Sequence, residues 1–245
     1  MLKIISYPIS FLFYLCFTCA LLVFHLGQWI GFNFFGYKGH KKAVDALNWT
    51  ILKVLHVLGT RFSFTMENEI PDNVPLIIVC NHQTTWDIPS IIWHLRKIHP
   101  AFIAKKELGK GIPSISYNLT HGASVLINRR KPLEATQQII KIGQYAAKNN
   151  RSVVIFPEGT RSKDGLPKPF KERGLKTLFE QMPGGYVLPV TVNNSWKLQQ
   201  YGFFPMGLGV HLKHRVHRAI KISDYTHQEL IAVTEQIITQ SISAT

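Results

Sequence analysis

An uncharged segment at the N-terminus limits most strongly what this chain can fold into. Residues 4–37 run for 34 positions without a single Asp, Glu, Lys or Arg. The first part, residues 4–24, is long enough to cross the ~30 Å hydrocarbon layer of a membrane, which takes about 20 apolar residues. It is too long to be the apolar part of a signal peptide. We therefore predict that this segment binds a membrane, either by spanning it or as a shallow hairpin.

The residues that come next fit a membrane boundary. Aromatic side chains favour the membrane–water interface, and they occupy positions 29, 32, 34, 35 and 37. A basic cluster follows; it comprises Lys38, His40, Lys41 and Lys42. It carries more positive charge than Lys3 at the other end of the apolar segment, which predicts that the C-terminal end of the segment faces the cytoplasm. Residues 43–58 carry apolar side chains at helical spacing on one face. They either lie in the membrane interface or pack against the domain that follows.

The overall composition leaves several functions open. The chain has 245 residues, enough for one α/β domain and an appendage. Its formal net charge of +14 favours phosphates, anionic lipid headgroups, nucleic acids or acidic carrier proteins. Histidines at positions 211, 214 and 217 do not predict a metal site, because a strand would place the middle one on the opposite face. Charge alone would also fit a non-catalytic membrane- or nucleic-acid-binding protein.

The heptapeptide NHQTTWD, residues 81–87, predicts a catalytic pair. The preceding residues 75–80 are apolar and rich in β-branched side chains, which is typical of a buried strand. Asp87 followed by Pro89 is typical of a helix N-cap with proline in the first turn. We expect the loop between strand and helix to fold back and bring His82 to Asp87. A histidine held by a carboxylate in one tautomer is a general base, and Asn81 would order the turn through side-chain bonds to the backbone.

A second motif, FPEGTRS at residues 156–162, follows another predicted strand, residues 152–156. Gly159 lets the backbone approach a ligand closely, and backbone N–H groups near it are candidate oxyanion donors. Arg161 offers a planar fork that suits phosphate oxygens. Glu158 would position Arg161 or accept a hydrogen bond from a hydroxyl group. Further strands are predicted at residues 123–127, just before Arg129, and at residues 187–192, which contain a proline.

In this order the motifs resemble those of the lysophosphatidic acid acyltransferase family, the 1-acylglycerol-3-phosphate acyltransferases. The resemblance extends over roughly residues 63–225 and rests on NH-x4-D, an arginine-ended strand, FPEGTRS and a proline-containing strand. It implies that Arg129 and Lys105 lie near the phosphate of the acceptor. It also implies that four consecutive residues of the second motif hold the glycerol-phosphate part of the acceptor, namely Glu158, Gly159, Thr160 and Arg161. One extra residue after Phe170 breaks the family pattern at Lys171.

The resemblance implies an α/β fold with a glycerolipid acyltransferase-like mixed sheet flanked by helices, preceded by a membrane-binding helical segment. We expect residues 1–62 to be the membrane anchor and residues 63–245 the acyltransferase domain. The expected reaction moves an acyl group from acyl-CoA or acyl carrier protein to the free hydroxyl of 1-acylglycerol-3-phosphate, giving phosphatidic acid. It requires neither a metal nor a bound cofactor.

The expected partners are a lipid membrane, a lysophospholipid acceptor and the acyl donor, and not a nucleic acid. The expected location is the bacterial inner membrane, with the active site on the cytoplasmic side. Two catalytic alternatives stay open. An acyltransferase for another lysophospholipid or for glycerol-3-phosphate would carry the same motifs. A hydrolase would need a serine nucleophile, and the sequence has no G-x-S-x-G motif.

Overall fold

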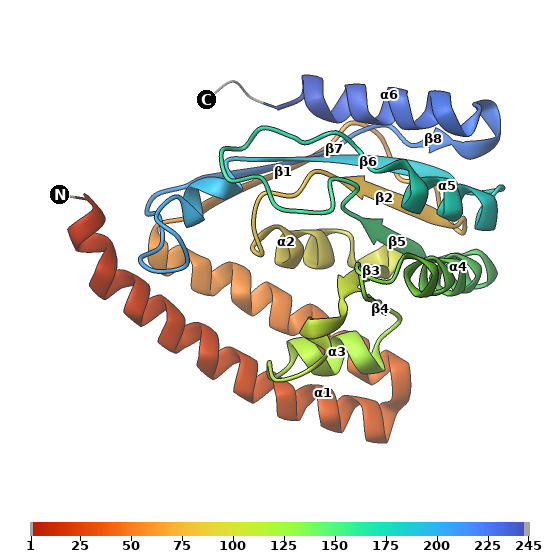
Figure 1. Ribbon diagram of the computed structural model, residues 1–245. Helices are drawn as coiled ribbons and strands as arrows, with labels where there is room; N and C mark the ends of the chain where they lie inside the picture. The colour runs from red at the N-terminus through yellow and green to blue at the C-terminus, as the bar shows by residue number, and fades with distance from the viewer. Residues whose placement is uncertain (1, 243–245) are drawn as a thin grey trace.

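The computed structural model describes residues 2–242 and has an α/β fold in which helices cover both faces of one sheet (Figure 1). The α-helices are α1 Leu2–Leu55, α2 Asp87–His94, α3 Ile115–His121, α4 Pro132–Asn149, α5 Glu172–Gln181 and α6 His227–Gln240. The strands are β1 Arg61–Met66, β2 Leu76–Cys80, β3 Pro100–Lys105, β4 Val125–Ile127, β5 Ser152–Ile155, β6 Tyr186–Asn193, β7 His211–Val216 and β8 Ile220–Lys221. Short 3₁₀ turns η1–η5 are His56–Leu58, Arg96–Ile98, Lys106–Gly109, Ser195–Gln199 and Ile222–Asp224.

The sheet has the order β1-β7-β6-β2-β5-β3-β4, and β8 pairs with β6 outside this path. Strands β6, β2, β5, β3 and β4 are mutually parallel, whereas β7 runs antiparallel to β6 and parallel to β1. This mixed sheet confirms the predicted fold class. Because β2, β5 and β6 are parallel neighbours, the loops that follow them leave from the same edge of the sheet. Ligands of open α/β sheets bind at that edge.

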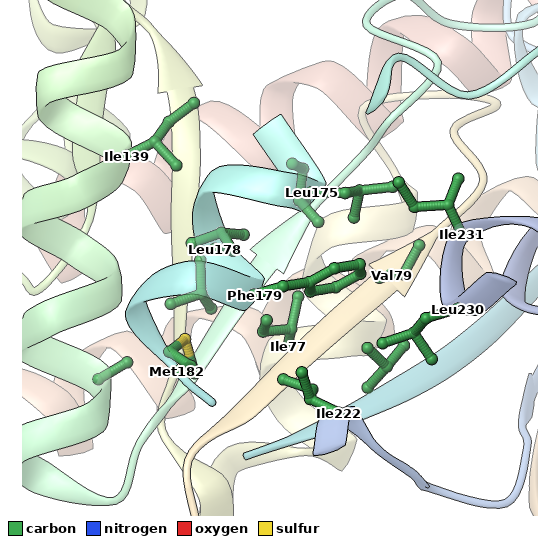
Figure 2. Packing of buried hydrophobic residues seen from close by; sticks show 14 of the residues in the cluster. Ile77, Val79, Ile139, Leu175, Leu178, Phe179, Met182, Ile222, Leu230 and Ile231 are labelled. Carbon is green, nitrogen blue, oxygen red and sulfur yellow. The ribbon is translucent and has the colours of Figure 1, made fainter. Parts of the chain in front are cut away.

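Strand β2 forms the centre of the core because every one of its side chains is apolar and buried. Alternate side chains point to opposite faces of a strand. Ile77 and Val79 pack under α4, α5 and α6 in the cluster of Figure 2. Ile78 and Cys80 pack on the other face against α2. Burial on both faces explains why the predicted strand was a continuous apolar run rather than an alternating one.

Helix α1 is a hairpin of two helical arms, residues 2–35 and 37–55, joined at Gly36, whose φ of 59° and ψ of −149° are not helical. Figure 1 shows the arms diverging from this corner beneath the domain. Gly31 and Gly39 let the arms touch, because a Cβ on Gly31 would lie 2.7 Å from the carbonyl oxygen of Gly39. The segment of residues 4–24 is one continuous helix within the first arm, and α1 is long and apolar enough to cross a membrane, so the choice between a spanning segment and a shallow membrane hairpin stays a prediction.

The second arm belongs to the domain core. This arm carries apolar side chains at helical spacing, and all of them are buried; they are Val44, Leu47, Ile51, Leu52, Leu55 and Leu58. Of the two positions expected for residues 43–58, the structure therefore shows packing against the domain. The first arm also contributes Phe13 and Leu21 to a cluster with Trp86. Its opposite side exposes a broad row of large apolar side chains, including Phe11 and Leu15. The division into segments 1–62 and 63–245 stays a prediction.

Candidate active site

The site begins in the loop that connects β2 to α2. The Nδ1 atom of His82 lies 2.9 Å from Oδ2 of Asp87. Asp87 is completely buried, whereas the His82 side chain is 17% exposed. An ionised carboxylate only accepts hydrogen bonds, so Nδ1–H is the donor and Nε2 is left as the acceptor. Within residues 2–242 no group bonds to Nε2, and the ring stacks on Phe156 with centroids 4.1 Å apart.

The Asp87 carboxylate hydrogen-bonds to the loop before it and does not cap the helix after it. Helix α2 begins at Asp87 with Trp86 as its N-cap and without a side-chain cap, so the predicted N-cap role is wrong. Oδ2 instead accepts the backbone N–H groups of Gln83 at 2.8 Å and Thr84 at 3.0 Å. Burial opposes ionisation, but the hydrogen bonds from His82, Ser195 and this loop outweigh it and lower the pKa of Asp87. Asp87 is therefore an anion at neutral pH.

Ser195 completes the environment of Asp87 and was missed from the sequence. Its hydroxyl donates to Oδ1 of Asp87 and is also bonded to the hydroxyl of Thr84. Ser195 opens η4 just beyond the end of β6, so the strand order brings it to the edge where β2 also ends. Because this hydroxyl faces the carboxylate and not the imidazole, it is not placed as the nucleophile of a hydrolase.

Glu158 joins the two motif loops to each other. One carboxylate oxygen accepts the backbone N–H of His82 at 2.8 Å, and the other accepts the backbone N–H of Lys168 at 2.9 Å. In return, the N–H of Ser162 donates to the carbonyl of His82 at 2.8 Å. Burial raises the pKa of Glu158 despite these bonds. Each oxygen thus accepts one backbone N–H and keeps a further acceptor site, so the role of Glu158 toward Arg161 or a substrate hydroxyl stays a prediction.

Asn81 fixes the end of β2 against β6. Its side-chain amide donates to the carbonyl of Val192 at 2.8 Å and accepts the N–H of the same residue at 2.7 Å. The expected bonds from side chain to backbone are therefore present, but they reach the neighbouring strand rather than the turn. They continue the strand pairing by one step and set the position from which His82 leaves the sheet.

A cationic cluster surrounds Gly159. This residue has a φ of 73°, and a Cβ there would lie 2.9 Å from Nζ of Lys171. Arg129 donates to the carbonyl of Gly159. The structure thus brings Lys171 to the FPEGTRS loop, although the sequence pattern had broken at that position. The N–H of Gly159 donates to the carbonyl of Phe156 at 3.0 Å, so it is not the free oxyanion donor that the motif suggested.

Arg161 and Thr160 belong to the same loop, and Lys105 lies on the same edge of the sheet. Arg161 donates to the hydroxyl of Thr85 at 2.8 Å, which ties it to the loop of His82. The hydroxyl of Thr160 accepts Nζ of Lys168 at 2.9 Å. Lys105 ends β3 at a position paired with Ile127, on the edge from which the Arg129 loop leaves, and its side chain is exposed.

The arrangement combines two chemical functions. A histidine with a free Nε2, oriented by a buried anion, can take a proton from a hydroxyl group. Arginine and lysine side chains beside it can hold phosphate oxygens. The fold and the site thus define an α/β protein with a histidine–carboxylate pair, in the geometry that suits a general base, at the carboxyl edge of its sheet.

Comparison with known proteins makes this class specific. The sequence model of the Acyltransferase family matches residues 61–193. That is more than half of the chain, and it includes His82, Asp87 and the FPEGTRS loop. The chain belongs to the acyltransferase family.

Several curated relatives are named 1-acyl-sn-glycerol-3-phosphate acyltransferase. The protein of Helicobacter pylori is 36% identical over 51% of this chain and 54% of its own length. The protein of Cocos nucifera is 35% identical over 51% of this chain and only 37% of its own length. That of Saccharomyces cerevisiae is 28% identical over 89% of this chain and 66% of its own length. The solved structure of the LPA acyltransferase PlsC from Thermotoga maritima superposes with a TM-score of 0.76, at 23% identity, over 98% of this chain and 95% of that one, which confirms the fold.

Proposed function

We propose that this protein transfers an acyl group from a thioester donor to the free hydroxyl of 1-acylglycerol-3-phosphate and so forms phosphatidic acid. The observation that carries the proposal is the His82–Asp87 pair, whose free Nε2 lies in the loop that Arg161 also contacts. The pair supplies a base, and the cations beside it suit a phosphate. The names of the curated relatives support the same reaction.

The proposed chemistry proceeds through one tetrahedral intermediate. Nε2 of His82 accepts the hydroxyl proton while the hydroxyl oxygen attacks the thioester carbonyl carbon. The imidazolium that forms is stabilised by the Asp87 anion. The intermediate collapses with cleavage of the carbon–sulfur bond, and His82 returns its proton to the departing thiolate. The products are an ester and a free thiol, so atoms and charges balance without a metal or a bound cofactor.

The binding roles follow from position. Arg161, Arg129 and Lys171 converge on the Gly159 loop, where they would hold the acceptor phosphate, and Lys105 would add positive charge at the same edge. The donor would be acyl-CoA or an acyl carrier protein, both of which are anionic and suit a chain of charge +14. The enzyme would work at the bacterial inner membrane, with the site on the cytoplasmic side.

The test is acyl transfer by the purified full chain in detergent micelles. Lysophosphatidic acid, glycerol-3-phosphate and a neutral lysophospholipid are offered in turn, each with labelled acyl-CoA and with labelled acyl carrier protein. We expect label in phosphatidic acid from lysophosphatidic acid. The variant His82→Ala should lose about 10² to 10⁴ of this turnover, the usual contribution of a general base.

Two results would contradict the proposal. Label that appears only with a neutral lysophospholipid would refute the assignment of a phosphate-bearing acceptor. Turnover that is unchanged in His82→Ala would refute the base. His56→Ala is the matched control, because the exposed His56 lies in η1, outside both motif loops, and its ring contacts the carbonyl of Leu52 and the ring of Phe62.

A further inference from the structure

A loop of exposed aromatic residues lies next to the proposed active site and has no role in the reaction. It comprises Tyr201, Phe203 and Phe204, between η4 and β7, and is called the aromatic loop below. Phe203 is 63% exposed and Phe204 is 49% exposed. Exposed aromatic side chains that gather in one place on a protein surface mark an interaction site.

The aromatic loop is held in place by the first arm of α1. The hydroxyl of Tyr14 donates to the carbonyl of Phe203 at 2.6 Å, and the N–H of Met206 donates to the hydroxyl of Ser10 at 2.7 Å. The rings of Tyr7 and Phe204 meet edge to face with centroids 5.5 Å apart. The aromatic side chains are therefore presented on a fixed support, rather than folded inward.

The same contacts make the aromatic loop continuous with the apolar side of α1. Phe11, which is 68% exposed, and Leu15 lie on the arm that holds the loop. Lys3 lies over the ring of Tyr201 at 5.4 Å, so a positive charge borders this surface. Aromatic and apolar side chains edged by lysine are the composition of surfaces that lie in a membrane interface.

The aromatic loop also reaches the phosphate-binding side of the active site. The guanidinium of Arg161 lies over the ring of Phe203 at 5.5 Å. Arg161 in turn donates to Thr85 in the loop of His82. One surface therefore runs from the apolar side of α1, across the aromatic loop, to the arginine beside the catalytic pair.

We propose that the aromatic loop is a second membrane-contacting element, which inserts into the headgroup region of an anionic bilayer beside α1. Seated there, Phe203 holds Arg161 at the level of the lipid phosphates. An acceptor then moves along the membrane surface to the active site with its acyl chain still in the bilayer. The route of the acceptor rests on the proposed function, but the membrane contact does not.

Site-specific fluorescence tests the contact independently of catalysis. Cys16 and Cys19 are replaced by serine, and Cys80 stays because it is buried. Single cysteines then replace Phe203 or Phe204 in the aromatic loop, Phe11 on α1 as a positive control, and Leu133 as a matched negative control. Leu133 is 82% exposed on α4. Each receives an environment-sensitive dye and is mixed with phosphatidylcholine vesicles, with or without phosphatidylglycerol, that carry quencher-labelled acyl chains.

We expect blue-shifted emission and quenching by the labelled lipids at positions 11, 203 and 204, and neither at position 133. Quenching at position 11 without quenching at 203 or 204 would overturn the proposal. A shift at 203 that appears only when acyl carrier protein is added, without lipid quenching, would overturn it in favour of a protein partner. The readout stays valid if the protein transfers acyl groups to no acceptor, so the two proposals fail separately.

Kinetics then tests the route. The double variant Tyr201→Ser and Phe204→Ser avoids Phe203, which contacts Arg161. Its turnover of long-chain acceptor in vesicles should fall about tenfold, as expected when buried apolar surface is lost from a membrane contact. Its turnover of a short-chain, water-soluble acceptor should equal that of the unaltered protein, and Leu133→Ser should change neither rate. Equal losses with both acceptors would refute a role in access from the membrane.

Discussion

Replacing Asp87 with asparagine separates the charge of this side chain from its shape. The Oδ2 position receives N–H groups from His82, Gln83 and Thr84, so the new amide NH2 cannot occupy it. The Oδ1 position faces the hydroxyls of Ser195 and Thr84, and a hydroxyl can rotate to accept a hydrogen bond. The amide oxygen therefore stays on Nδ1–H of His82, and Nε2 stays free to accept a proton.

The expected loss follows from the charge alone. Opposite unit charges about 4 Å apart attract by about 4 kcal/mol at an effective dielectric constant near 20. The hydrogen bond that remains between the neutral asparagine amide and the charged imidazolium retains about 2 kcal/mol of this stabilisation. The transition state is then destabilised by about 2 kcal/mol, and turnover falls by roughly 30-fold.

Two measurements check this reasoning. Initial rates of acyl transfer give the change in turnover, with Asp72→Asn in an exposed loop as the control for the loss of one negative charge. Nitrogen-15 NMR of labelled protein gives the tautomer of His82, whose signals are identified from their absence in His82→Gln. A loss of less than about threefold would refute the use of the Asp87 charge, since it corresponds to under about 1 kcal/mol. A His82 ring protonated on Nε2 alone would refute the orientation argument.

Three further predictions concern the surroundings of the pair. Gly159→Ala should lower the free energy of unfolding, measured in urea, by about 1–3 kcal/mol, because the φ of 73° disfavours a side chain and the Cβ would meet Lys171. The control Gly184→Ala, where the Cβ has open space, should show no comparable loss. Arg161→Ala should raise the KM for the acceptor about tenfold or more, and a raised donor KM with an unchanged acceptor KM would contradict the assignment. The pKa of Asp87 is lowered below its ordinary value of 3.8, so its contribution to stability is complete above that pH and is lost as the pH falls through the lowered value. In urea, the free energy of unfolding of the unaltered protein should exceed that of Asp87→Asn by a constant amount near neutral pH, and this excess should shrink below pH 3.8. An excess that shrinks already near pH 6 would contradict the lowered pKa of Asp87.

The sequence predicted the strands that lie in the middle of the sheet. Strands β2, β5 and β6 are buried on both faces, so each is a largely apolar run without polar alternation. Strands β1 and β3 were not predicted. β1 is only partly buried at the sheet edge and has polar residues between its apolar ones. β3 does have an apolar run at residues 100–104, but the run begins with a proline just after η2 and contains two alanines, which is not typical of a strand.

Local spacing was also enough to predict the contact between His82 and Asp87, because both belong to one loop. It was not enough for Ser195, which bonds to Asp87 from 108 positions away. That contact depends on β6 lying next to β2, and strand order is not encoded in a short motif. The same reason applies to Glu158, which bonds to the N–H of His82 across 76 positions. The residues of each motif were identified, but the bonds between the motifs required the tertiary structure.

The packing of α1 against Trp86 has a practical consequence. The rings of Phe13 and Phe17 lie edge to face on Trp86 with centroids 5.1 and 5.2 Å away, and Trp86 directly precedes Asp87. A truncation that starts after Tyr37 would remove both rings along with the first arm of α1, uncover the indole and loosen the loop of His82 and Asp87. Loss of activity on truncation would then say nothing about membranes. A water-soluble form for crystallisation or screening is better made by substituting outward-facing residues such as Phe11 and Leu15, with the inner face of α1 kept intact.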